Sequence, residues 1–282
     1  MERKMIAWSA QEAANCIAIP LSLDHKYSRG VLGVITGSSN YPGAAVLTTS
    51  AAAATGLGMV RFHGSARLNL LVLNSTPATV IHPGKVSAWL AGSGIDSKRY
   101  SNFATWTRHR KFRWLKKQSR PTVLDAGALY LIGKLAQPIL ITPHSGELAT
   151  LLSSRGVKVT SQEITSDPKK WIQIAVETLG DTILLKGSIT YVANDDLLIE
   201  LPKATPWLST AGTGDVLAGI IGALVANNAG KILNDYNQLA RVAATGALIH
   251  ALAAEESSQG GPIRLQEQIE AIPHVIAHLI GT

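Results

Sequence analysis

The sequence of 282 residues contains one cysteine, Cys16, and aromatic residues make up only 5% of it. A single cysteine excludes an internal disulfide and a Cys-x-x-Cys metal site, and it is typical of a reducing compartment. No stretch approaches the roughly 18 uninterrupted apolar residues of a membrane span. The segment after "MERK" is interrupted by polar residues, so we expect no signal peptide and predict a cytoplasmic protein without a membrane partner.

Markers of disorder and of domain linkers are also missing. The chain is 46% hydrophobic and 16% charged, which is typical of a folded globular protein. No Pro/Ser-rich linker, low-complexity tract or internal repeat divides it. We therefore predict a single domain over residues 1–282.

The net charge of +7 comes from one segment. Residues 108–120 (RHRKFRWLKKQSR) hold seven Lys/Arg and no acid, so the rest of the chain has 26 − 7 = 19 basic residues against 19 acidic ones. We expect a solvated helix or loop that faces water or a phosphate-rich ligand. Nucleic-acid binding through this stretch, aided by Phe112 and Trp114, is the alternative. Because no recognised binding module surrounds it, we predict no nucleic-acid partner.

Segments of strand and helix character alternate along the chain. Residues 30–36 predict a buried strand, residues 43–56 a helix of small residues, and residues 59–64 a second strand. This pattern is typical of a mostly parallel sheet covered by helices on both faces. Residues 182–193 predict a hairpin with a Gly-Ser turn, and the carboxy half is mostly helical.

Six loops of unusual composition follow the predicted strands. Ligands of parallel sheets bind at the carboxyl ends of strands, where loops lead into helices. Convergence of so many such loops on one rim is hard to explain by turn chemistry alone, so we predict a ligand site there. The loops contain TGSSNYPGAA (36–45), AGSGID (91–96), DAGAL (125–129), TPHSGE (142–147), KGSIT (186–190) and AGTGD (211–215).

The glycine patterns GxxxxGK[ST] and GxGxxG are absent, so any phosphate chemistry needs another architecture. Gly212 and Gly214 allow the backbone to fold tightly, and the helix after them offers free N–H groups at the positive end of its dipole. This predicts binding of a phosphate or a migrating phosphoryl group, with Asp215 placed to accept a proton from a substrate hydroxyl. The alternative is a common turn in which Asp215 only stabilises the helix dipole.

The chain resembles the NAD(P)H-hydrate dehydratases, a carbohydrate-kinase-related family of the ribokinase-like superfamily. The resemblance covers nearly the whole chain, and TPHxGE is more specific than GTGD, which sugar and vitamin kinases share. It implies an α/β ribokinase-like fold with three α/β/α layers and a mostly parallel central sheet. The matching motifs are, in order, HKYSRGVLGVITGSSNYPGAA, AGSG, LDAGAL, ITPHSGE, LLKGSIT and STAGTGDVLAG.

The resemblance implies repair of a damaged coenzyme. Such enzymes take the S epimer of hydrated NADH or NADPH and phosphorylate the ring hydroxyl at the expense of ADP or ATP, which converts a poor leaving group into a good one. Departure of phosphate restores NADH or NADPH, and AMP or ADP is released. Mg²⁺ is the implied cofactor. The alternative is a small-molecule kinase of the same superfamily, for a vitamin precursor or a sugar.

The matched motifs also assign site residues by resemblance. Asp215 would take the hydroxyl proton while the amides of Gly212 and Gly214 hold the phosphoryl group. The hydrated coenzyme would contact Ala44, Ala45, Gly94, His144 and Asp215. The nucleotide would contact Lys186, Gly187, Ser188, Ile189, Thr190 and Gly214. Glu147 is the candidate to organise magnesium through water.

Several of these positions have a purely structural alternative. Without the resemblance, residues 186–190 would be a hairpin turn with an exposed lysine. Glu147 lies in the first turn of a predicted helix, with Ser145 as a possible cap, so it can serve only the helix start. Asp125 can face the pocket or cap the next helix. The family commonly has Gly-Pro-Gly where this chain has Gly92-Ser93-Gly94, which bears on the rigidity of that loop.

The resemblance further implies partners and an assembly. About 30 residues precede the first predicted strand, too few for a second domain, so we expect the NAD(P)H-hydrate epimerase to be a separate chain. A homo-oligomer, often a tetramer, is also implied. His274 and His278 have the spacing of a metal pair, but without a third ligand they predict a surface helix. His250 is predicted to be a packed helix residue.

Overall fold

The computed structural model describes residues 3–97 and 103–281. Within these ranges the strands form one nine-stranded sheet with the order β1-β9-β8-β7-β6-β5-β4-β2-β3. All neighbours are parallel except β7–β8 and β8–β9, so the predicted mostly parallel sheet is confirmed. The strands are β1 (Lys4–Ala7), β2 (Val31–Ile35), β3 (Met59–Phe62), β4 (Ala88–Ala91), β5 (Thr122–Leu124), β6 (Ile139–Ile141), β7 (Thr182–Leu185), β8 (Tyr191–Ala193) and β9 (Leu197–Glu200).

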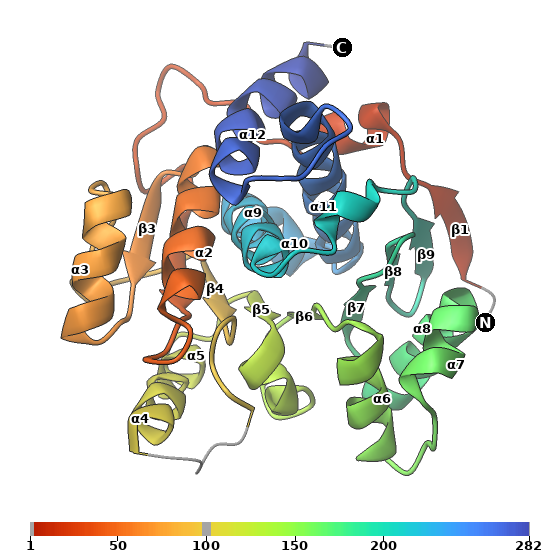
Figure 1. The fold of residues 1–282 in the computed structure, drawn as a ribbon. Coiled ribbons are helices and arrows are strands. Elements are labelled where there is room, and N and C mark those ends of the chain that lie inside the picture. The colour runs from red at the N-terminus through yellow and green to blue at the C-terminus, as the bar shows by residue number, and fades with distance from the viewer. Residues whose placement is uncertain (1–2, 98–102, 282) are drawn as a thin grey trace.

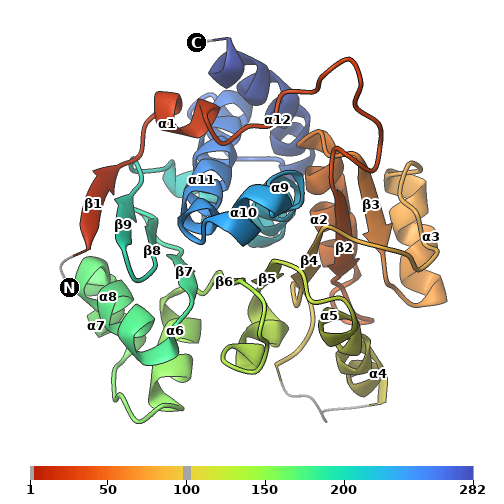
Figure 2. The same cartoon turned by 180° about the vertical axis from the view of Figure 1, so that it is seen from behind.

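Helices cover both faces of the sheet and give three α/β/α layers (Figure 1). Helices α2, α9, α11 and α12 lie on one face, and α4 to α8 lie on the other, as the view from behind also shows (Figure 2). The helices are α1 (Ala10–Ala14), α2 (Pro42–Ala54), α3 (Ala66–Ser75), α4 (Phe103–Lys111), α5 (Arg113–Lys117), α6 (Ser145–Ser153), α7 (Ser161–Ser166), α8 (Pro168–Leu179), α9 (Thr213–Asn227), α10 (Ala229–Asn234), α11 (Asn237–Ser258) and α12 (Leu265–Ile280), with short 3₁₀ helices η1 (Ala126–Leu131) and η2 (Pro206–Leu208).

The strands bury both of their faces in two separate hydrophobic cores. Side chains alternate along a strand, so Leu90 of β4 belongs to the core under α9 while its neighbour Trp89 belongs to the core under α4 to α8. The same alternation separates Leu140 from Ile139 on β6. Runs of apolar residues are therefore expected in the central strands, because neither face meets water.

Helix α9 is the central helix of its layer and packs along α2 and α11. Gly219 permits this approach, because a Cβ atom there would lie 2.5 Å from the carbonyl oxygen of Thr48 on α2. Nearly all residues of α9 after its first turn are buried. The close packing fixes the start of α9 above the carboxyl ends of the central strands.

The element predictions hold where the pattern is strong. The strand, helix and strand predicted at 30–36, 43–56 and 59–64 are β2, α2 and β3, and β7 and β8 form the predicted hairpin. The hairpin connection is longer than a Gly-Ser turn, since five residues separate the two strands. Strands β1 and β9 were not predicted. Both are four residues long and pair with each other, so neither carries a long apolar run.

The basic stretch 108–120 is only partly solvated, which corrects the expectation of a fully solvated segment. Arg108 is 4% exposed and donates to the carbonyl oxygens of Thr36, Gly37 and His63. Phe112 belongs to the core below the sheet. The stretch is amphipathic, so its exposed cations share short helices with buried anchors.

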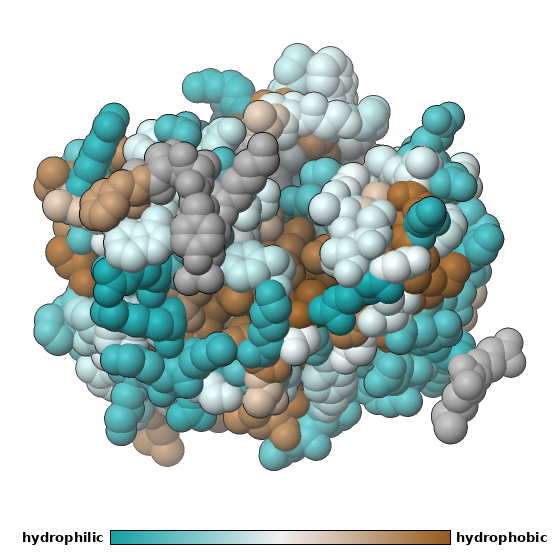
Figure 3. Space-filling view, turned by 90° about the horizontal axis from the view of Figure 1, so that it is seen from below, coloured by the Kyte–Doolittle hydropathy of each residue, from teal (hydrophilic) through white to brown (hydrophobic). Residues whose placement is uncertain are grey.

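The face that carries α4 to α8 is mostly hydrophilic, with apolar residues visible in a recess across its middle (Figure 3). Among the described helices, none is both long enough and apolar enough to cross a membrane.

Candidate active site

The six predicted loops meet at the carboxyl edge of the sheet and line two cavities. The first, of about 380 Å³, is here called the Lys186 cavity. The second, of about 1070 Å³, is called the Asp215 cavity. Loops 36–45, 91–96, 125–129 and 142–147 contribute to the Asp215 cavity, and loop 186–190 contributes to the Lys186 cavity. Loop 211–215 contributes to both, so the predicted convergence on one rim is confirmed.

The first turn of α9 is the wall between the two cavities. Gly214 faces the Lys186 cavity, whereas Gly212 and Asp215 face the Asp215 cavity. Gly212 has a φ of 97°, a left-handed conformation that favours glycine, and no side chain caps the helix. A ligand in either cavity therefore touches the same helix start.

Two backbone amides at this helix start lack a protein acceptor. Thr213 N donates to the carbonyl oxygen of Thr210 at 3.3 Å, and Asp215 N donates to that of Gly212 at 3.0 Å. Within residues 3–97 and 103–281, the N–H groups of Gly212 and Gly214 make no hydrogen bond. Such unpaired N–H groups at the positive end of a helix dipole form an anion site.

Asp215 is a buried carboxylate at this helix start, and its pKa is shifted. Burial, reinforced by the negative charge of Asp125, raises its pKa to about 7, although the ammonium of Lys186 acts in the opposite direction. A carboxylate with a pKa near neutrality can both accept a proton and exist ionised at working pH. Its place in the first helical turn also stabilises the dipole, so the two predicted roles are compatible.

Lys186 follows β7 directly and is held among carboxylates. Its Nζ lies 3.1 Å from Oδ1 of Asp125 and 3.8 Å from Oε2 of Glu147. Burial disfavours the charged amine, but Asp125 and Glu147 outweigh it and raise the pKa of Lys186. The Lys186 backbone N–H donates to the carbonyl oxygen of Pro143, which brings loops 142–147 and 186–190 side by side. The lysine is thus a fixed cation at the cavity wall.

His144 caps helix α6, a role expected of Ser145. Its Nδ1 accepts from the N–H groups of Gly146 and Glu147, and Oε2 of Glu147 accepts from the His144 N–H at 2.9 Å. Ser145 instead pairs with the hydroxyl of Ser161. The capping prediction was wrong because the cap lies one residue earlier. The His144 side chain remains 59% exposed and lines the Asp215 cavity with Glu147.

Most of the predicted site residues lie on a cavity wall, and two do not. Ala45 is fully buried, and its Cβ packs toward Gly37 on the protein side of α2. Ile189 is half-buried and packs against the core beneath the sheet. Neither is a lining residue. The residues that do line a cavity are Ala44, Gly94, His144, Glu147, Gly212 and Asp215 in one, and Lys186, Gly187, Ser188, Thr190 and Gly214 in the other.

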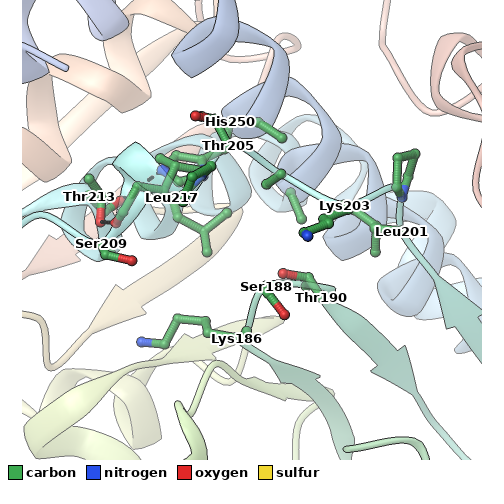
Figure 4. Close-up of a pocket in the computed structure, with 18 residues that line it drawn as sticks. Lys186, Ser188, Thr190, Leu201, Lys203, Thr205, Ser209, Thr213, Leu217 and His250 are labelled. Atoms are coloured by element: carbon green, nitrogen blue, oxygen red, sulfur yellow. Dashed lines mark hydrogen bonds between the residues drawn. The ribbon is translucent and has the colours of Figure 1, made fainter. Parts of the chain in front are cut away.

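His250 is a site residue that the sequence did not reveal. It is 7% exposed, lines the Lys186 cavity and lies near Thr213 above Lys186 and Ser188 (Figure 4). Its sequence neighbours are mostly alanine and leucine, which predicts a residue packed within a helix. His250 is such a residue of α11, and it lines the cavity as well. Residues 201–206, which also line this cavity, had no recognisable motif either. Residues that only shape a cavity wall can be of many types, so they leave no motif in the sequence.

The carboxylates around Lys186 do not form a complete metal-binding cage among the described residues. Within the described part of the chain, no group of three or more His, Cys, Asp or Glu residues could hold a metal ion. His274 and His278 are exposed on α12, as predicted. Lys186 occupies the space between Asp125 and Glu147. Magnesium commonly binds one or two carboxylates plus substrate phosphates, and Glu147 fits that pattern.

Comparison with known proteins gives the family. A family model described as NAD(P)H-hydrate dehydratase matches residues 32–273, and the chain belongs to this family. It is 34% identical over 238 residues to a bifunctional NAD(P)H-hydrate repair enzyme of Mycobacterium tuberculosis, covering 79% of this chain and 46% of that protein. It is 29% identical over 252 residues to an ADP-dependent (S)-NAD(P)H-hydrate dehydratase of Neisseria meningitidis, covering 82% and 78%. The chain spans about half the length of the bifunctional relatives.

Solved structures confirm the ribokinase-like fold. An ADP/ATP-dependent NAD(P)H-hydrate dehydratase from Bacillus subtilis, co-crystallised with ATP and Mg²⁺, superposes with a TM-score of 0.79 at 22% identity, covering 97% of this chain and 98% of that one. A ribokinase-like superfamily protein from Enterococcus faecalis gives 0.81 at 20% identity, covering 99% and 97%.

Proposed function

We propose that this chain is a nucleotide-dependent dehydratase that repairs the S epimer of hydrated NADH or NADPH. The observation that carries the proposal is the division of the first turn of α9 between two cavities. Gly214 and Lys186 face one, and Asp215 faces the other. A nucleotide in the Lys186 cavity and a hydroxyl-bearing substrate in the Asp215 cavity would meet at the unpaired amides.

The proposed reaction begins with transfer of the terminal phosphoryl group. Asp215 takes the proton from the ring hydroxyl, the hydroxyl oxygen bonds to the terminal phosphorus, and the bond from that phosphorus to the bridging oxygen breaks, releasing AMP or ADP. The amides of Gly212 and Gly214 hold the transferred oxygens, and Lys186 offsets their charge. The C–O bond to phosphate then breaks and a proton leaves the neighbouring ring carbon, which restores the dihydropyridine.

Magnesium would accompany the nucleotide phosphates, with Glu147 as its protein ligand through water. The ion would supply positive charge to the phosphates. Lys186, Gly187, Ser188, Thr190 and Gly214 would bind the nucleotide, and Ala44, Gly94 and His144 would bind the coenzyme. We further propose that residues 1–282 act as one catalytic domain in a cytoplasmic homo-oligomer. An NAD(P)H-hydrate epimerase would interconvert the two epimers of the hydrate.

The test is an assay of two products with purified protein, ADP or ATP, Mg²⁺ and hydrated NADH. Equal release of inorganic phosphate and recovery of the near-ultraviolet absorbance of dihydronicotinamide support the proposal. A stable phosphorylated product without free phosphate would instead indicate a small-molecule kinase.

A further inference from the structure

A chain of buried polar side chains runs beneath the boundary between the two cavities. The hydroxyl of Ser93 donates to Oδ2 of Asp125 at 2.8 Å, and the hydroxyl of Thr142 donates to Oδ1 at 2.8 Å. Lys186 Nζ donates to the same Oδ1 at 3.1 Å. Both oxygens of the Asp125 carboxylate are therefore occupied, and each donor comes from a different loop of the site.

The position of Asp125 decides between its two possible roles. It precedes η1, yet its side chain makes no capping hydrogen bond to that helix. It is 4% exposed, and Ser93 is fully buried. Burying a carboxylate is unfavourable unless it is paired with a cation and hydrogen-bonded. The two hydroxyls and the Lys186 ammonium meet this requirement, so they stabilise the ion pair between Asp125 and Lys186. Asp125 faces Lys186 and does not cap the helix.

The ammonium of Lys186 has a fixed position at the cavity boundary only if a partner such as the Asp125 carboxylate holds it. A lysine is a mobile point charge on a flexible four-carbon stem, so its ammonium is placed only by what it contacts. Asp125 is its nearest carboxylate, at 3.1 Å, whereas Glu147 lies at 3.8 Å and is shared with the cap of α6. The direction of the Lys186 ammonium therefore follows from the position of the Asp125 carboxylate.

Ser93 extends this link to the substrate side. Its carbonyl oxygen accepts from the Gly37 N–H at 2.8 Å, and the next residue, Gly94, lines the Asp215 cavity. One residue thus joins the loop after β2, the loop after β4 and the Asp125 carboxylate. A displacement of the Ser93 loop would therefore move the Lys186 ammonium, through the hydrogen bond from Ser93 to Asp125 and the one from Lys186 to Asp125.

We propose that Asp125 and Ser93 are positioning residues that hold the ammonium of Lys186 at the boundary between the two cavities. Their action on turnover rests on the proposed function, but the geometry that they impose on Lys186 does not. Neither side chain lines a cavity among the described residues, so neither is placed to touch a bound ligand directly.

The experiment compares Asp125→Asn, Ser93→Ala and the wild-type protein by lysine acylation. A small N-hydroxysuccinimide ester is reacted with each full chain, and mass spectrometry gives the acylation rate at Lys186 relative to Lys203. Lys203 is exposed and lines the same cavity, so it serves as the internal reference. Loss of the charged hydrogen bond in Asp125→Asn is expected to raise the ratio about tenfold. Ser93→Ala is expected to raise it by a smaller factor.

Turnover and nucleotide binding give the second readout. In Asp125→Asn, kcat is expected to fall about tenfold while the Kd for ADP stays unchanged or decreases, because Lys186 keeps its charge but loses its fixed position. Thr245→Val removes a buried hydroxyl on α11, away from both cavities, and is expected to leave kcat, Kd and the acylation ratio unchanged.

An unchanged acylation ratio at Lys186 in Asp125→Asn would overturn the inference. A kcat loss matched by an equal rise in the Kd for ADP, together with faster acylation at all lysines, would also overturn it, since that pattern indicates general loosening. If the wild-type protein proves to act on another substrate, the proposed function fails and the acylation ratio still decides this inference.

Discussion

The imidazole of His250 is held against the first turn of α9, with Nε2 3.0 Å from the carbonyl oxygen of Thr213. A carbonyl only accepts, so Nε2 carries the proton. Burial lowers the His250 pKa to about 4, which keeps the ring neutral near pH 7. The amide of Gln268 donates to the His250 backbone oxygen, so α11 and α12 together support the wall between the two cavities.

This buried histidine predicts acid sensitivity of the fold. His250 and the buried His63 both have a pKa of about 4 in the folded protein, below the ordinary 6.5. The unfolded chain therefore binds more protons between these values. The contribution of each neutral histidine to the free energy of unfolding is fully present above about pH 6.5. It is lost as the pH falls toward 4, by up to about 3 kcal/mol for each group.

Urea unfolding at pH 7.5 and pH 5 measures this effect. His250→Gln and His63→Gln should each reduce the difference in unfolding free energy between the two pH values. His274→Gln is the control, because His274 is exposed on α12. The attribution would be refuted by equal pH dependence in all three variants.

Replacing Asp215 tests the proposed base. Asp215→Asn should fold normally and lose turnover by a factor of about 10² to 10⁴, with a smaller change in KM. In the wild-type protein, kcat/KM should rise with pH through about 7 as Asp215 ionises. Steady-state kinetics across pH check both points. Retention of near-normal turnover in Asp215→Asn would reject the assignment.

The motif-bearing parts of the site were predictable from sequence because they have strict backbone needs. Gly212 adopts a positive φ, and Asp215 sits in the first turn of α9, as AGTGD indicates. The side-chain links were not predictable. Ser93 meets Asp125 only because β4 and β5 are neighbours in the sheet, and His250 meets Thr213 across two packed helices. Those contacts depend on strand order and helix packing, which local patterns do not encode.

The edge strand β1 and the burial of Arg108 were missed for a related reason. The strand β1 is four residues long with an exposed pattern, so no periodicity marks it. Arg108 looks like its exposed neighbours in a basic run, yet three backbone carbonyls of distant segments surround its guanidinium. Burial of one member of a charge run is decided by the fold, not by composition.

The buried position of Arg108 predicts that even the conservative substitution Arg108→Lys lowers the free energy of unfolding. Arg108→Lys leaves the charge but removes most of the planar donors that reach Gly37 and His63, so the free energy of unfolding should fall by about 2 kcal/mol. Arg110→Lys, at an exposed position on the same helix, should change it by less than about 0.5 kcal/mol. Urea unfolding of the two variants checks the contrast, and equal midpoints would contradict the buried role.

Asp181 predicts a stabilising substitution away from the site. Burial, with a smaller contribution from Asp195, raises the pKa of Asp181 to about 7 in the folded protein. Asp181 loses its proton near pH 4 in the unfolded chain but only near pH 7 in the folded protein. The buried carboxyl therefore lowers the free energy of unfolding increasingly as the pH rises from about 4 to 7. Asp181→Asn should therefore raise the unfolding free energy at pH 8 by about 1 to 2 kcal/mol. Thermal unfolding at pH 8 and pH 4 checks this, and a gain at pH 4 equal to that at pH 8 would contradict it.

The most direct measurement of the central claim follows one oxygen atom. Hydrated NADH labelled with ¹⁸O at the ring hydroxyl is converted with ADP or ATP, and the released phosphate is analysed by mass spectrometry. Phosphoryl transfer to the hydroxyl at the start of α9 predicts that the ¹⁸O appears in inorganic phosphate. Recovery of the label in water, with unlabelled phosphate, would contradict the account.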